Sequence, residues 1–172
     1  MKRYGMLEGV FRALLHAGCS PCRCCLVVAV LIALNLGNKM HGQDFIISEF
    51  LAASMRGLRD DNGGASDWIE IFNPNSERLS MRGWSLTDDP DDLAKWSFAD
   101  TAIEGQNFLL VFASGKDRSD PTGLLHTNFG LDRAGEFLAL VRPDGTIASS
   151  FASEFPQQRT DVSYGRQMDI AV

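Results

Sequence analysis

The stretch Ser66–Pro74 constrains the fold of this chain more than any other. It reads Ser-Asp-Trp-Ile-Glu-Ile-Phe-Asn-Pro, so two aromatic and two β-branched residues fall within a short run. A loop rich in glycine, asparagine and aspartate precedes the run, and Asn75-Ser76 follows it. β-Branched and aromatic side chains suit a pleated surface, whereas Gly, Asn and Pro favour turns. The stretch therefore predicts a β-strand between two turns, because it is too short and too sharply bounded for a helix.

Short strands at intervals of about ten residues are also predicted along the rest of the chain. They cover 44–54, 79–87 with a bend at Gly83, 94–98, 107–113, 124–131, 136–141 and 147–151. Both 107–113 and 136–141 are apolar on both faces, and we expect 107–113 to be central. Pro143–Thr146 (Pro-Asp-Gly-Thr) predicts a tight turn, since Pro presets φ and Gly accepts a positive φ. Because no helical period follows residue 43, we predict an all-β sandwich.

Residues 1–43 differ from the remainder of the chain in charge and in hydropathy. They hold five Lys or Arg against a single Glu, which leaves a net charge of −10 on the remainder. Cys24–Leu36 is an apolar run of roughly a dozen residues behind a basic leader, shorter than the ~20 that span a bilayer. This pattern predicts an N-terminal hydrophobic helix, either a signal peptide cleaved near Gly42 or Gln43 or an uncleaved signal anchor. We therefore expect a secreted or cell-envelope protein that meets the membrane only through this segment.

All four cysteines fall in this same leader, and they do not form a pattern that predicts a metal site. Cys19, Cys22, Cys24 and Cys25 abut the apolar run, and no second ligand pair follows at zinc-finger spacing. Without the leader the chain has no cysteine and one histidine, His126. We expect the remainder to fold by itself without disulfides, in a chain that begins at Gln43. Its acidity also argues against binding to nucleic acid or to an anionic membrane surface.

Five motifs follow one another along the predicted strands. They are Ile47-Ser48-Glu49, Ser66–Asn73, Leu79–Asp88, Trp96-Ser97-Phe98 and Leu109–Ser114. In this order and spacing they resemble the lamin tail domain that bacteria carry in exported proteins. The resemblance runs from about residue 44 to residue 153. It implies an immunoglobulin-like β-sandwich that acts as a non-catalytic module.

The segment after the resembling region offers a second comparison. Asp161–Arg166 is similar to the segment that follows this module in large envelope proteins with a spore-coat-H-type kinase domain, and six residues follow it here. We therefore place the domain at 44–166 and a C-terminal stub at 167–172. Two functions remain open. One is an exported module that contacts a protein or glycan partner or positions a neighbouring domain, and the other is an accessory domain of a larger envelope enzyme.

The predicted domain has few residues of the types that catalyse reactions or bind metals. The loop Asp60–Asp67 gathers three carboxylates, an amide and two glycines, as calcium requires, but Ile71 stands where an EF-hand has Glu. We favour a solvated turn with Asp67 facing water, and we interpret Asp88–Asp92 as another charged turn. His126 lacks the Gly-x-Ser-x-Gly elbow of a hydrolase. We therefore predict no enzyme activity, no catalytic residue, no cofactor and no metal.

Aromatic residues give two further expectations. Trp68, Trp84 and Trp96 stand among aliphatic neighbours, so we expect core positions for them and not a platform for a sugar. A sandwich sheet normally buries only one face, whereas 107–113 and 136–141 are apolar on both. We expect Phe112 and Phe137 to lie on outer faces and to contact a partner.

Overall fold

The computed structural model of the chain describes residues 43–151 and 153–167. These residues belong to the compact unit Gly42–Val172. The strands are β1 (Ile46–Leu51), β2 (Asp67–Phe72), β3 (Leu79–Ser80), β4 (Ser85–Thr87), β5 (Trp96–Ser97), β6 (Ala102–Ile103), β7 (Phe108–Ala113), β8 (Leu125–His126), β9 (Leu138–Val141), β10 (Ile147–Phe151) and β11 (Tyr164–Gly165). Within this described part no helix could cross a membrane. The predicted N-terminal hydrophobic helix lies outside the described residues.

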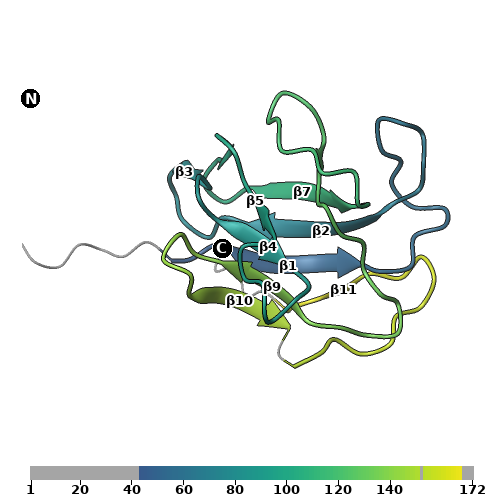
Figure 1. The fold of residues 1–172 in the computed structure, drawn as a ribbon. Helices are drawn as coiled ribbons and strands as arrows, with labels where there is room; N and C mark the ends of the chain where they lie inside the picture. Colours follow the sequence, from purple (N-terminus) through teal and green to yellow (C-terminus); the bar gives the residue numbers. More distant parts are fainter. Residues whose placement is uncertain (1–42, 152, 168–172) are drawn as a thin grey trace, which may run out of the picture. The chain divides into compact units, whose positions relative to one another are not determined.

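Two sheets form the sandwich (Figure 1). One has the strand order β11-β1-β2-β7-β8 and the other β10-β9-β4-β5, while β3 and β6 form a small ribbon. β2 lies in the middle of the first sheet and pairs with β7 along its whole length, from Asp67 opposite Ala113 to Phe72 opposite Phe108. The prediction of a strand within Ser66–Pro74 and of an all-β sandwich is confirmed.

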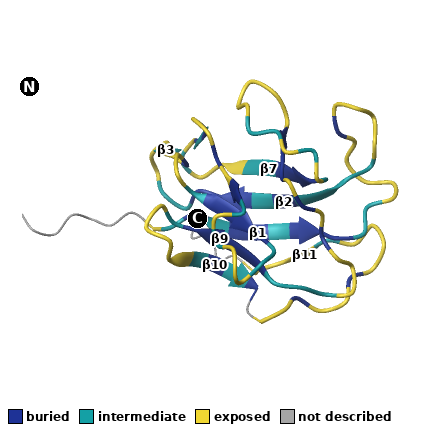
Figure 2. Ribbon diagram, viewed as in Figure 1, coloured by how far each residue is buried: buried dark blue, intermediate teal, exposed yellow. Residues whose placement is uncertain are grey.

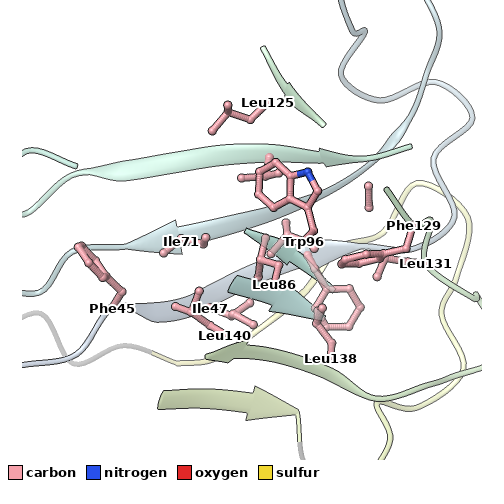
Figure 3. Packing of buried hydrophobic residues seen from close by; sticks show 14 of the residues in the cluster. Phe45, Ile47, Ile71, Leu86, Trp96, Leu125, Phe129, Leu131, Leu138 and Leu140 are labelled. Atoms are coloured by element: carbon pink, nitrogen blue, oxygen red, sulfur yellow. The ribbon is translucent and has the colours of Figure 1, made fainter. Parts of the chain in front are cut away.

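The core lies between the two sheets and takes large side chains from both. Figure 3 shows Ile47 and Ile71 from the first sheet facing Leu86, Leu138 and Leu140 from the second, all of them inaccessible to solvent. Burial is concentrated in the strands, and the connecting loops are largely exposed (Figure 2). This distribution is the one that alternating apolar residues on two facing sheets produce.

Local irregularities in the strands have identifiable causes. The apolar alternation of β1 is imperfect because a β-bulge interrupts its register with β2 between Ile47 and Glu49. The predicted bend at Gly83 is present with φ +80°, and Gly145 closes the predicted turn with φ +83° and an N–H bond to the Arg142 carbonyl at 2.9 Å. The prediction for 124–131 is wrong in extent, since only β8 forms a strand there.

The C-terminal segment closes one side of the sandwich. β11 pairs antiparallel with β1, and the Arg166 guanidinium lies 4.8 Å from the ring centre of Phe151 in β10. Phe155 is 2% exposed, and its ring centre lies 4.5 Å from that of Phe50. Residues 155–166 are therefore part of the packed structure.

Candidate functional site

An ion pair with a residue that is distant in the sequence holds the acidic loop after β1 in place. The Asp60 carboxylate, which is inaccessible to solvent, lies 2.6 Å from Lys116 Nζ and accepts a bond from Ser66 Oγ at 2.7 Å. The bond from Lys116, followed by that from Ser66, holds the pKa of Asp60 well below its usual range. The expected solvated turn is wrong in this respect, because the partner of Asp60 stands 56 residues away in the sequence.

Further contacts join the same loop to residues 114–124, which connect β7 to β8 and include Lys116. Arg118 Nη1 lies 2.6 Å from Asp61 Oδ2, and Arg118 Nη2 donates to Asn62 Oδ1 at 3.1 Å. The amide of Asn62 also accepts a bond from Lys116 at 3.0 Å. Asp60, Asp61 and Asn62, which could have served as calcium ligands, therefore bind cationic side chains of the protein.

His126 lies beneath these ion pairs and is inaccessible to solvent. Its Nδ1 is 2.8 Å from Ser114 Oγ, its Nε2 is 3.4 Å from Asp61 Oδ1, and its ring stacks on Phe112 with centres 5.3 Å apart. Burial, followed by the nearby Lys116, lowers the pKa of His126. A general base must come within hydrogen-bond reach of its substrate, and this imidazole is enclosed. His126 therefore contacts Ser114 and Asp61 from an enclosed position that a substrate does not reach.

Metal removal tests this assignment of the acidic loop. We expect EDTA to leave the melting temperature almost unchanged, because no group of three or more His, Cys, Asp or Glu among the described residues could hold a metal ion. A calcium site filled at a hundred times its Kd would add about 2.7 kcal/mol to the folded state. Differential scanning calorimetry with and without EDTA measures this. A large drop that Asp60→Ala or Asp67→Ala abolishes would contradict the assignment.

The second acidic turn and the tryptophans have structural roles. Asp88 pairs with Lys95 Nζ at 2.6 Å, so Asp88–Asp92 is a charged turn as predicted. Trp96 is 3% exposed and packs edge-on against Phe98, with ring centres 4.9 Å apart. Trp84, half-buried, packs against Phe45, and Trp68 is half-buried on β2. The expectation of core positions is met fully by Trp96 and partly by the other two.

The outer face of the five-stranded sheet differs from the expectation. Phe112 is only 3% exposed, since His126 covers it, and Phe137 is half-buried and precedes β9. The expected exposure of Phe112 on an outer face is therefore wrong. Phe108, at the other end of β7, is 46% exposed and packs against Phe72, with ring centres 4.7 Å apart.

A cavity of about 450 Å³ opens at the end of the sandwich where β1 ends and β2 begins. Its walls are Ala52–Met55, Asp67, Leu131–Arg133 and Thr160. These residues come from the start of β2 and from three connecting segments. Loops at the end of a sandwich are where such folds usually carry contact residues. The cavity is therefore the candidate functional site.

Hydrogen bonds to aspartate fix two of these walls. Asp67 Oδ1 accepts the Ser54 N–H at 2.7 Å, while Asp161 Oδ1 accepts the N–H groups of Met55 and Arg56 at 2.7 and 2.9 Å. Those two bonds lower the pKa of Asp161. Burial raises the pKa of Asp67, against the effect of its single bond from Ser54. Asp67 was expected to face water, and instead it is half-buried beside the cavity.

The sequence contained only a weak signal for this site. Asp67 was singled out as part of a calcium-like loop, whereas the structure separates it from the Asp60 ion pair and places it against Ser54. Asp132 and Arg133 lie in a connection without a motif, so their approach to Asp67 depends on long-range packing.

Two facing sheets, built from short strands within the described residues, define an immunoglobulin-like β-sandwich. The family model of the Lamin Tail Domain matches residues 39–154, which is more than half of the chain. The chain therefore belongs to the lamin tail domain family, as the motifs indicated. A comparison with curated proteins found none that matches this chain.

Proposed function

We propose that this chain is an exported contact module, which docks a protein or glycan partner, or positions a neighbouring domain, at the cell envelope. The observation that carries the proposal is the cavity of about 450 Å³ in a fold that is generally non-catalytic. Ligand sites are typically concave and lined by apolar groups with a few polar ones. This cavity combines small apolar residues with two carboxylates and one guanidinium.

Export is the part of the proposal that rests on the sequence. The basic leader and the apolar run Cys24–Leu36 support it, either as a cleaved signal peptide or as an anchor. A second candidate function is that of an accessory domain in a larger envelope enzyme. The similarity of Asp161–Arg166 to the segment that follows this module in large envelope proteins with a spore-coat-H-type kinase domain favours it. Genomic DNA beyond the codon for Val172 distinguishes the two.

A binding experiment with the full chain tests the contact role. We expect the immobilised chain to retain a partner from an envelope extract or a glycan array, and Ala53→Leu, which fills the cavity, to reduce retention at least tenfold. Phe108→Ser serves as the control, because it removes an exposed apolar side chain of the outer sheet face. Loss of retention in Phe108→Ser but not in Ala53→Leu would place the contact on the sheet face, and no retention by the unmodified chain would contradict the contact role.

A further inference from the structure

Asp67 is a half-buried carboxylate that has no ion pair within the described part of the chain. Two other acids of the domain, Asp60 and Asp88, are each paired with a lysine Nζ at 2.6 Å. Asp67 has one hydrogen bond, from the Ser54 N–H, and that bond uses Oδ1. Burying a charge without a partner is unfavourable. A cation that enters the cavity would therefore find an acceptor whose charge is not yet compensated.

The neighbouring walls determine what kind of cation fits. Asp132 supplies a second carboxylate, whose Oδ1 accepts the Ala134 N–H at 2.8 Å. Ala52, Ala53 and Leu131 form an apolar wall against which an aliphatic stem can pack. Lysine combines such a stem with a charged ammonium group. A bare metal ion would gain nothing from the apolar wall.

The remaining polar group of the cavity helps to decide whether the ligand is a peptide or a sugar. The guanidinium of Arg133 has no hydrogen bond or ion pair with any described residue, and it can donate to a backbone carbonyl of a peptide. Tryptophan, tyrosine and phenylalanine are missing from the lining, so a sugar ring would find no aromatic surface. The chemistry of the cavity therefore favours a peptide over a glycan.

We propose that the cavity binds a lysine side chain on an extended peptide segment of a protein partner. Asp67 and Asp132 receive the ammonium group, the alanines and Leu131 pack against the stem, and Arg133 donates to the peptide backbone. This inference rests on the proposed contact function and selects a protein partner for it. The occupant is a basic segment, which also complements the net charge of −10 on the chain after residue 42.

A titration with a minimal probe tests the proposal. The full chain in mild detergent and physiological salt is titrated with N-acetyl-lysine-methylamide, and amide shifts are followed by NMR. We expect saturable shifts at Ser54 and Arg133 with a Kd on the order of millimolar, as one side chain allows. N-acetyl-norleucine-methylamide keeps the stem but lacks the charge, and it should bind at least tenfold more weakly. Equal binding of both probes, or no shift with the lysine probe, would overturn the proposal.

Variants of the cavity make the test specific. Asp67→Asn retains an oxygen for the Ser54 N–H, and we expect it to weaken lysine binding at least tenfold. Asp120→Asn removes an exposed acid outside the cavity walls and should leave binding unchanged. If Asp67→Asn does not fold, Asp132→Asn tests the role of the second carboxylate. Ala53→Leu then tests whether the ligand needs the volume of the cavity.

The outcomes separate this inference from the contact function on which it rests. Retention of a partner from the extract by Asp67→Asn and by the unmodified chain alike would overturn the lysine site and leave the contact role intact. Retention of a glycan in place of a basic peptide would overturn it as well. Retention of nothing by the unmodified chain would contradict the contact role itself.

Discussion

Ending the chain at Glu154 should abolish cooperative unfolding, although the match to the lamin tail domain model also ends at residue 154. The cut removes Phe155, which is 2% exposed and whose ring centre lies 4.5 Å from that of Phe50. The Phe155 N–H also donates to the Glu136 carbonyl at 2.9 Å. A core side chain and a connection between distant segments are therefore lost together.

The expected loss is large in comparison with the stability of an ordinary domain. Truncation of a buried phenylalanine to alanine costs about 3–5 kcal/mol, and whole domains have about 5–15 kcal/mol. The cut further removes β11 from the edge of β1 and Asp161 from the N–H groups of Met55 and Arg56. The summed loss of stabilising free energy should exceed the free energy of unfolding of the domain.

Urea unfolding followed by circular dichroism measures the effect. The full chain and a chain that ends at Gln167 should unfold at the same midpoint, and the chain that ends at Glu154 should show no sharp transition. Phe155→Ala in the full chain should lower the free energy of unfolding by about 3–5 kcal/mol. An unchanged midpoint for the shorter chain would mean that residues 155–166 only lie on a complete sandwich.

The strands that could be predicted from the sequence are those with a local pattern. Ser66–Pro74 and Pro143–Thr146 carry their own start and stop signals, so β2 and the turn before β10 were located correctly. Strands of two residues, such as β8 and β11, contain too few positions for any period. They exist because longer strands beside them offer hydrogen bonds.

The candidate site was less accessible to sequence reasoning, because it depends on contacts between distant residues. Lys116 reaches Asp60 across 56 positions, and His126 covers Phe112. Neither contact leaves a local signal, so a buried ion pair was mistaken for a solvated turn and a covered phenylalanine for an exposed one. Asp67 was identified as notable, but its neighbours in the cavity were not.

Replacing Lys116 with methionine should lower the melting temperature at pH 7 on the order of 5–10 °C. The substitution keeps most of the aliphatic stem and removes the charge 2.6 Å from the enclosed Asp60 carboxylate. The remaining bonds from Ser66 Oγ and from the N–H groups of Asn62 and Gly64 cannot replace a cation. An enclosed carboxylate that loses its only cation is strongly destabilising.

The pH dependence of this loss follows from the lowered pKa of Asp60. Because its carboxyl group ionises more readily in the folded chain than in the unfolded chain, the pair stabilises the fold above the unfolded pKa of about 3.9. That stabilisation is lost as pH falls toward the folded pKa. The gap in melting temperature between Lys116→Met and the unmodified chain should therefore be widest near pH 7 and narrow toward pH 3.

Thermal melts of both chains between pH 7 and pH 3 measure this gap. Arg78→Met is the matched control, because the Arg78–Glu104 pair spans 2.9 Å but its side chains are 65% and 66% exposed. Exposed pairs contribute at most about 1 kcal/mol, so this control should change little at any pH. If the gap for Lys116→Met stays constant from pH 7 to pH 3, the lysine acts through the packing of its stem. A gap that narrows below about pH 4 shows that the ion pair holds the 114–124 connection against the loop after β1, over His126.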